Sequence, residues 1–198
     1  MSPAHAGAHD LVVVGASWGG LQALRTLLGP LPSGLGAAVV VVQHRSADSH
    51  RSGLRDLLAA VTELRVSDVE DKDPLEVAHV YLAPPDFHTL VDVDHLSLSV
   101  EAAVEYSRPS IDVLFASAAE SHRERCVGVV LTGANADGAA GLARIVDLGG
   151  AAIVQDPKTS ERPEMPRAAL NAAPSARVAP LEEIASLLVE LCAQGVAA

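Results

Sequence analysis

Three polar residues of the chain, Ser17, His44 and Asp137, could together carry out nucleophilic catalysis. A serine hydroxyl becomes a nucleophile once a neighbouring base removes its proton. A histidine is the usual base, and an aspartate orients the histidine and stabilises its charged form. Each of the three residues closely follows a run of apolar residues, which is typical of the end of a buried strand. The residue types and their placement therefore favour acyl transfer through a Ser-His-Asp triad.

The segment around Ser17 predicts a strand, a glycine-rich turn and a helix. Residues 11–14 are apolar and mostly β-branched, as in a short buried strand. The glycines within 15–20 permit a tight turn, and 21–28 has the pattern of a helix. The first-turn N–H groups and the dipole of such a helix favour negative charge. This place would therefore suit either an activated hydroxyl or a bound phosphate.

The rest of the chain alternates predicted strands with predicted helices. Further strands are predicted at 37–42, 64–66, 79–83, 127–131 and 152–154. Further helices are predicted at 53–60, 109–120, 139–148 and 181–191. The alternating segments 89–93 and 96–100 predict an antiparallel hairpin. This order predicts an α/β fold with a doubly wound, mostly parallel sheet, helices on both faces and a small antiparallel hairpin.

In a doubly wound sheet, ligands bind outside the carboxyl ends of the strands. Neighbouring strand ends lie about 5 Å apart, so Ser17, His44 and Asp137 are expected to converge there. Each residue also has an ordinary interpretation. Ser17 could be a helix N-cap, His44 a polar residue at a strand end, and Asp137, which precedes a glycine, a turn residue. Their joint occurrence at three strand ends favours catalysis.

Trp18, the single tryptophan, stands next to the predicted nucleophile. It would be either a core aromatic that caps the turn or a wall of the substrate cleft, and the sequence favours neither. Among the other histidines, His88 lies in a predicted loop near the site and remains a candidate. The histidines other than His44 are His5, His9, His50, His79, His88, His95 and His122, and most of them are interpreted as surface residues.

Composition limits the class of protein. A chain of 198 residues is long enough for one substantial α/β domain, predicted at 11–194 after an N-terminal tail at 1–10. The net charge of −11 argues against nucleic acid and against an anionic membrane surface as partners. Cys126 and Cys192 have no metal-ligand spacing and are expected to be reduced. No apolar segment approaches the roughly 18 residues of a membrane-spanning helix, so the protein is expected to be cytoplasmic.

A dinucleotide-binding site is the main competing interpretation of the glycine-rich turn. The turn at 15–20 departs from G-x-G-x-x-G because Ser17 occupies the place of the second glycine, where a side chain obstructs the pyrophosphate. The second strand also ends in Gln43-His44 rather than in an acidic residue that could bind a ribose. Both departures count against NAD, and a nucleotide-binding α/β domain stays a lesser alternative.

Six ordered motifs resemble the catalytic domain of the CheB-type chemotaxis protein-glutamate methylesterases, and the resemblance runs from Leu11 to the last predicted helix. Any one motif is weak, whereas the six in order are specific. They are VGASWGG at 14–20, VQH at 42–44, VYLAP at 80–84, RPSIDVLF at 108–115, LTG at 131–133 with DG at 137–138, and VQD at 154–156 with MPRAA at 165–169.

The resemblance implies a parallel α/β sheet and hydrolysis of glutamyl methyl esters on the cytoplasmic helices of chemoreceptors. Some members of the family also deamidate receptor glutamines. The family's nucleophile, base and third triad member map to Ser17, His44 and Asp137. Backbone N–H groups of Trp18 and Ala134 are expected to receive the oxyanion. The reaction needs no metal or cofactor, and no membrane insertion is expected.

The chain departs from the family pattern at a few positions. Trp18 stands where threonine is common, and Arg45 and Ala134 stand where methionine is frequent. These changes leave the triad intact and leave receptor specificity open. No receiver domain precedes Leu11, so control by phosphorylation of the same chain is not expected. A constitutive esterase, a separate receiver or regulator protein, and another sensory pathway all remain open, as does a catalytically weak binding module in a chemosensory array.

Overall fold

The computed structural model describes residues 9–44 and 51–193. Most of the predicted tail at 1–10 and the predicted loop at 46–50 lie outside this part of the chain, as does Arg45.

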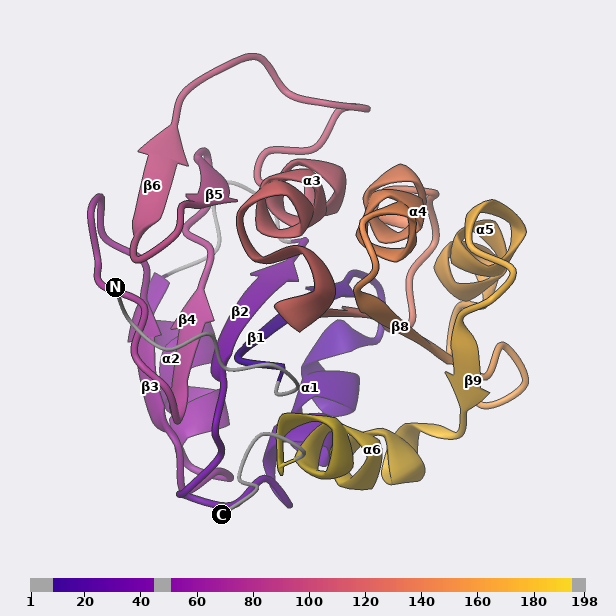
Figure 1. Cartoon of the computed structure of the whole chain (residues 1–198), viewed down its shortest axis with the longest axis horizontal. Coiled ribbons are helices and arrows are strands. Elements are labelled where there is room, and N and C mark those ends of the chain that lie inside the picture. The colour runs from indigo at the N-terminus through magenta and orange to yellow at the C-terminus, as the bar shows by residue number, and fades with distance from the viewer. Residues whose placement is uncertain (1–8, 45–50, 194–198) are drawn as a thin grey trace.

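A seven-stranded sheet forms the centre of the molecule (Figure 1). Its strands are β1 (Leu11–Ala16), β2 (Ala38–Gln43), β3 (Arg65–Asp68), β4 (His79–Leu82), β7 (Cys126–Val130), β8 (Ala151–Gln155) and β9 (Arg177–Ala179). The spatial order is β3-β4-β2-β1-β7-β8-β9, and all neighbours pair in parallel. The chain winds outward from β1 to one edge and then returns to the other side of β1. The predicted doubly wound sheet is therefore confirmed.

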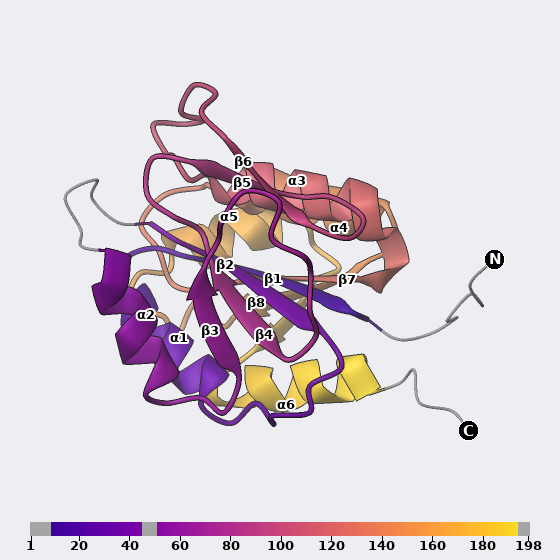
Figure 2. The same cartoon turned by 90° about the vertical axis from the view of Figure 1, so that its left-hand side faces the viewer.

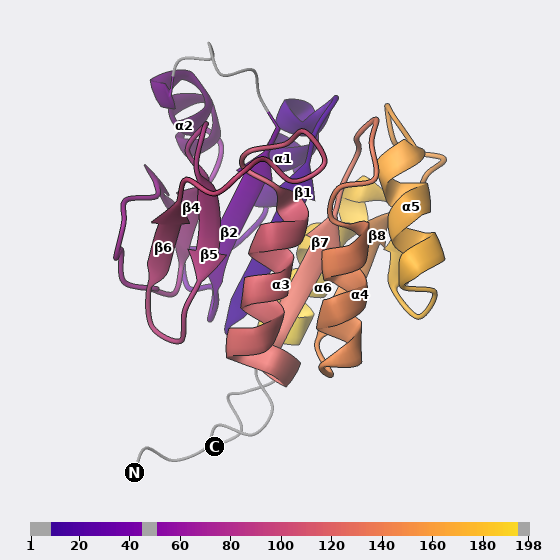
Figure 3. The same ribbon diagram turned by 90° about the horizontal axis from the view of Figure 1, so that it is seen from above.

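Helices cover both faces of the sheet, as predicted (Figures 1 and 3). They are α1 (Gly20–Leu28), α2 (Arg51–Ala59), α3 (Ile111–His122), α4 (Ala139–Asp147), α5 (Glu164–Ala172) and α6 (Leu181–Ala193), with a short 3₁₀ turn at Arg123–Arg125. Buried side chains of α1, α2 and α6 join the core on one face, and those of α3, α4 and α5 join the core on the other. Within residues 9–44 and 51–193, no helix combines the length and apolar composition needed to span a lipid bilayer.

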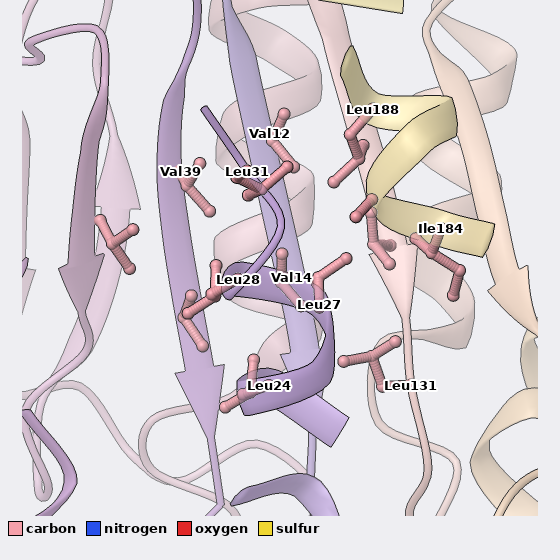
Figure 4. Close-up of a cluster of buried hydrophobic side chains, with 14 of the residues drawn as sticks. Val12, Val14, Leu24, Leu27, Leu28, Leu31, Val39, Leu131, Ile184 and Leu188 are labelled. Carbon is pink, nitrogen blue, oxygen red and sulfur yellow. The ribbon is translucent and has the colours of Figure 1, made fainter. Parts of the chain in front are cut away.

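The apolar run of β1 is buried on both faces of the sheet. Val12 and Val14 point to the core under α1 and α6, where Leu27 and Leu188 belong to the same cluster (Figure 4). The alternate residues of the strand, Leu11 among them, pack in the core on the opposite face. This two-sided burial explains why the central strands have no polar alternation.

Close packing brings α3 onto the end of β1. A Cβ placed on Gly15 would lie 2.4 Å from Cγ2 of Ile111, the first residue of α3. Gly128 of β7 is equally confined, because its Cβ would lie 2.7 Å from the Cδ1 atoms of Ile145 and Leu142. The first turn of α3 consequently lies directly over the carboxyl end of the central strand.

The predicted hairpin forms a separate antiparallel pair, β5 (His88–Val91) and β6 (Leu96–Ser99). Figure 2 shows it beside α3. Residues 100–109, which we call the arm, lead from β6 to α3 and project at the top of the view in Figure 1. The sequence predicts no regular element within 101–108, and the structure contains only the isolated bridge between Val104 and Ser107 there.

Several local predictions were wrong or incomplete. The helix α5 and the strand β9 were not predicted, because the segment 157–180 is rich in proline and carries no long apolar run. Pro163 and Pro166 are tolerated because they stand at the N-cap and in the first turn of α5.

The interpretation of most histidines as surface residues was wrong for His79 and His122, which are buried. His88, which was predicted to stand in a loop near the site, is also buried and begins β5. Each buried ring has a hydrogen-bonding partner, which offsets part of the free-energy cost of burying a polar side chain.

Candidate active site

The predicted catalytic residues lie at the carboxyl ends of the three central strands. Ala16 of β1 pairs with Gln43 of β2, so Ser17 and His44 are the next residues of adjacent strands. The His44 N–H donates to the Ala16 carbonyl at 2.9 Å. Asp137 lies in the loop after β7, on the other side of β1. This is where the order of strands reverses, the usual ligand site of such sheets.

The turn that carries Ser17 is fixed through its backbone. The Ser17 N–H donates to the Thr132 carbonyl at 3.0 Å, and the Ser17 carbonyl accepts from the Gly20 N–H at 2.9 Å. The same carbonyl accepts from Gln43 Nε2 at 2.8 Å. The Thr132 hydroxyl donates to the Trp18 carbonyl at 2.9 Å. Neighbouring loops thus hold the backbone of the proposed nucleophile on both sides.

The ordinary interpretation of Ser17 as a helix N-cap was wrong. Gly19, with φ of 77°, is the N-cap of α1, and no side chain caps this helix. The Ser17 hydroxyl makes no hydrogen bond with any residue in the described part of the chain. It borders a hollow of about 420 Å³ that is also lined by Gly19, Gly20, Leu21, Gln22, Arg25 and Gln43.

His44 and Asp137 are joined by a hydrogen bond of 2.8 Å between Nε2 and Oδ2. This bond places the ring proton on Nε2 and leaves the lone pair on Nδ1. Asn135 Nδ2 lies 3.4 Å from that Nδ1. Two of the three predicted residues are therefore in contact, whereas the Ser17 hydroxyl and His44 are not hydrogen-bonded to each other.

The Asp137 carboxylate is buried, with 1% exposure, against the N-terminus of α3. Its Oδ1 accepts from Ser110 Oγ at 2.9 Å and from the Asp112 N–H at 2.9 Å. Its Oδ2 accepts from the Ile111 N–H at 2.7 Å as well as from His44. The helix dipole adds further stabilisation of the negative charge. Asp137 therefore does more than shape a turn.

These contacts keep Asp137 ionised. Burial alone raises the pKa of this carboxyl group, because it disfavours the charged form. The hydrogen bonds from His44, Asp112, Ile111 and Ser110 favour the charged form more strongly, and the pKa of Asp137 is lowered. An ionised carboxylate only accepts hydrogen bonds, so it holds the imidazole with Nε2–H directed at it.

The backbone N–H groups predicted to receive an oxyanion are not used elsewhere in the described part of the chain. The N–H groups of Ser17 and Gly133 donate to backbone carbonyls, whereas those of Trp18 and Ala134 have no acceptor among residues 9–44 and 51–193. The loop that carries Ser17 packs closely against the loop that carries Ala134, because a Cβ on Gly133 would lie 2.9 Å from the Ser17 Cβ. The same Cβ would lie 2.1 Å from the Met165 sulfur of α5.

Trp18 is 59% exposed, so its interpretation as a core aromatic was wrong. Its indole N–H donates to Glu161 Oε1 at 2.9 Å, and the Arg162 guanidinium lies 5.3 Å from the ring centroid. This geometry allows a cation–π contact. The ring is thus held in place at the surface next to Ser17, and its role as a wall of the substrate cleft stays a prediction.

A second hollow, of about 480 Å³, opens beside His44. Most of its lining comes from the arm, whose Tyr106 side chain is fully exposed. The lining residues are His44, Asp86, Ala103, Tyr106, Ser107, Arg108 and Pro109. Ser17 and His44 therefore border two hollows at the same edge of the sheet.

Sequence reasoning missed several residues that shape this site. It assigned no role to Ser110, Asn135 or Glu161, although Ser110 carries a recognisable N-cap signal before the apolar residues of α3. His88 is fully buried under the arm instead of facing the site. In the described part of the chain, no group of histidine, cysteine and acidic residues could hold a metal ion.

Comparisons with known proteins match both the sequence and the fold of this chain. A family model described as CheB methylesterase matches residues 12–188. The solved structure of the Thermotoga maritima CheB methylesterase catalytic domain has a TM-score of 0.89 and 30% sequence identity, covering 93% of this chain and 99% of that chain.

Curated relatives match over almost the whole chain. A putative protein-glutamate methylesterase/protein-glutamine glutaminase of Leptospira interrogans is 42% identical over 184 residues, which are 92% of this chain and 95% of the relative. Protein-glutamate methylesterase/protein-glutamine glutaminase 2 of Anaeromyxobacter dehalogenans is 41% identical, over 96% of this chain and 55% of the relative. The protein-glutamate methylesterase FrzG of Myxococcus xanthus is 38% identical, over 92% and 54%. This chain thus spans about half the length of the last two relatives.

Proposed function

Because this chain belongs to the CheB methylesterase family, we propose that it hydrolyses glutamyl methyl esters on chemoreceptors or related sensory proteins, with Ser17 as the nucleophile. The observation that carries the proposal is the hydrogen bond between His44 Nε2 and the buried, ionised Asp137, one strand end away from Ser17. A serine hydroxyl beside an oriented imidazole is the arrangement that acyl transfer needs.

In the first half of the reaction, the Ser17 hydroxyl rotates toward Nδ1 of His44. Nδ1 takes the proton while Oγ forms a bond to the ester carbonyl carbon, and Asp137 stabilises the resulting imidazolium. The negative charge on the carbonyl oxygen is received by the backbone N–H groups of Trp18 and Ala134. When the tetrahedral intermediate collapses, the imidazolium returns its proton to the leaving methoxy group, and methanol departs.

In the second half, water attacks the acyl-enzyme and passes a proton to His44. The bond between Ser17 Oγ and the glutamyl carbonyl carbon breaks, Ser17 recovers its proton, and a free glutamate side chain is released. A glutamine side chain would follow the same path with ammonia as the leaving group. This second activity fits the names of the Leptospira and Anaeromyxobacter relatives.

The surroundings of Ser17 suit a polypeptide substrate. The esterified side chain would enter at Ser17, next to the hollow beside His44, and the exposed Trp18 ring would contact the polypeptide that carries it. Large exposed rings contribute contact area at low entropic cost, which is useful for binding another protein. The substrate segments would be the cytoplasmic helices of receptors, and a separate receiver or regulator protein is the partner proposed for control.

The proposal is tested by measuring methanol release from a methylated receptor with the wild-type chain and with Ser17→Ala. We expect release by the wild type and at least a 1,000-fold slower rate for the variant, since removal of a triad member leaves only a small residual activity. Equal thermal unfolding of both proteins is the control for folding. Full activity of Ser17→Ala would refute the mechanism, and receptor binding without methanol release would indicate a binding module.

A further inference from the structure

His88, the first residue of β5, is a buried histidine that the proposed reaction does not use. Its Nδ1 accepts from the Ser110 N–H at 3.2 Å, and its Nε2 lies 3.1 Å from the Ala102 carbonyl oxygen. A backbone N–H can only donate and a carbonyl oxygen can only accept. The ring must therefore be neutral, with its lone pair on Nδ1 and its proton on Nε2. Only 1% of the residue is exposed.

Through its Nδ1, His88 holds the backbone of Ser110, the first of three consecutive residues that donate hydrogen bonds to Asp137. Ser110 is the N-cap of α3, and its hydroxyl donates to Asp137 Oδ1 at 2.9 Å. The N–H groups of the next two residues, Ile111 and Asp112, donate to the same carboxylate. A shift of the Ser110 backbone would move all three donors together, and with them the carboxylate that orients the histidine base.

On the other side, His88 holds the arm. Ala102 belongs to residues 100–109, and Ala103 and Tyr106 of the same segment line the hollow beside His44. The base of the arm is closed separately, because Arg108 Nη1 donates to the carbonyls of Val100 and Glu101 at 3.1 Å. His88 is therefore an anchor near the start of a segment whose outer surface is exposed.

We propose that His88 is a positioning residue that couples the substrate-facing arm to the Asp137–His44 pair. The inference rests on the proposed function, since it takes the arm to contact the methylated polypeptide. One nitrogen of the ring keeps the carboxylate in place, and the other keeps the arm in place. The ring thereby fixes the arm and the N-cap of α3 relative to each other, and through that N-cap it supports the Asp137 carboxylate.

Two substitutions separate the halves of this coupling. In His88→Asn, the amide oxygen takes the place of Nδ1, so the acceptor for the Ser110 N–H is kept and the donor to Ala102 is lost. In His88→Gln, the amide nitrogen takes the place of Nε2, so the donor to Ala102 is kept and the acceptor for Ser110 is lost. Each variant is the matched control of the other.

Kinetics should split between the variants. His88→Gln should lower kcat by about 100-fold on both the methylated receptor and a small glutamate γ-methyl ester, since a misplacement of about 1 Å costs this much. His88→Asn should rescue kcat and raise KM about fivefold for the receptor alone, because a lost neutral hydrogen bond has roughly this effect. Ser17→Ala is the negative control.

An NMR measurement that needs no substrate distinguishes a failure of the proposed function from a failure of the proposed role of His88. The Nε2–H proton of His44 should give a downfield NMR resonance in the wild type and in His88→Asn, and His88→Gln should lose or shift it. If the wild type released no methanol, the proposed function would fail while this spectrum still tested the role of His88. An unchanged resonance and unchanged kcat in His88→Gln would overturn the inference. If His88→Gln does not fold, the test rests on His88→Asn, and a kcat of this variant more than tenfold below wild type would overturn the inference.

Discussion

A single carboxylate organises the chemistry at the scale of the residue. Asp137 receives hydrogen bonds from a side-chain hydroxyl, from two N–H groups at the start of α3 and from His44. Removal of one donor would leave a buried acceptor partly unsatisfied, and removal of the charge would leave several donors facing a neutral group. The orientation of the base thus depends on the ionised form of this residue.

Replacement of Asp137 by Asn should lower kcat by about 10⁴-fold, the effect expected when the orienting carboxylate of a triad is lost and the imidazole takes the wrong tautomer. The expected loss of unfolding free energy is about 1–3 kcal/mol, because an amide nitrogen then faces backbone donors. Methanol release and chemical denaturation measure the two effects. A kcat within tenfold of wild type would show that Asp137 does not orient the base.

The pH dependence of activity follows from the lowered pKa of Asp137. That carboxylate stays ionised throughout the range from about pH 5 to 8, in which histidine side chains ordinarily titrate. Activity should therefore show no decline from protonation of Asp137 anywhere in this range, because the carboxylate that orients the base stays ionised. The NMR resonance of the Asp137 carboxyl carbon, followed from pH 8 to pH 5, tests this, and a change that reports its protonation in that range would contradict the prediction.

The parts of the site that directly follow predicted strands could be predicted from the sequence. Ser17, His44 and Asp137 each follow a predicted buried strand, and the topology of parallel sheets brings such ends together. The support for Asp137 was not predictable, because Ser110 comes near it only through the packing of α3 on β1. The exposure of Trp18 also depends on tertiary contacts, here with Glu161 and Arg162.

At the scale of the element, the position of α3 depends on the small size of the residues beneath it. Ile111 lies at the start of the helix, directly over Gly15, and its N–H donates to Asp137. Any side chain on this glycine would push the helix N-terminus away from the sheet. The geometry of the carboxylate is therefore tied to the packing of one helix on one strand.

Substitution of Gly15 by Ala should destabilise the protein by about 1–3 kcal/mol, the usual cost of overpacking a core. The added Cβ would lie 2.4 Å from Ile111 Cγ2, so activity should fall together with stability. Addition of Ile111→Ala, which removes the clashing atoms, should make the double variant more stable than the sum of the single changes predicts. Chemical denaturation of the four proteins measures this coupling.

Gly53 supplies the matched control for that experiment. It lies within α2, and no atom lies within 4 Å of a Cβ placed on it. Gly53→Ala should therefore stabilise the protein by roughly 0.5–1 kcal/mol through helix propensity. Additive energies in the Gly15 and Ile111 cycle would show that the contact does not set the packing of α3.

Elements with strong periodicity were predicted, and those formed by tertiary contact were not. The central strands carry uninterrupted apolar runs, and α1 and α6 carry clear apolar faces. The three-residue strand β9 has two exposed residues and gains its structure by pairing with β8. The short helix α5 begins among prolines, and no sequence signal outweighed them.

At the scale of the whole molecule, buried histidines link stability to pH. Burial lowers the pKa of His79 and of His122, and neighbouring arginines lower both further. Carboxylates of Glu76 and Asp10 act in the opposite direction and do not reverse the shifts. Below the ordinary histidine pKa, the unfolded chain therefore binds protons more readily than the folded protein at both positions.

The free energy of unfolding should consequently decrease as the pH falls from about 7 to 5, and the loss should continue through the lowered pKa values of the folded state. Denaturation with urea at pH 7, 6 and 5 measures the decrease. The double variant His79→Gln, His122→Gln should show a shallower dependence over the same range. An equally steep dependence in the double variant would assign the effect to other groups.

The central place of β1 has a consequence for synthesis of the protein. Two of the proposed catalytic groups, Ser17 and His44, leave the ribosome long before the third, and β7, which delivers Asp137, must insert along the free edge of β1. A nascent chain that ends before this strand has the hydroxyl and the imidazole without the carboxylate. Hydrolysis would thus begin only after β7 has paired with β1, which makes turnover a reporter of that pairing.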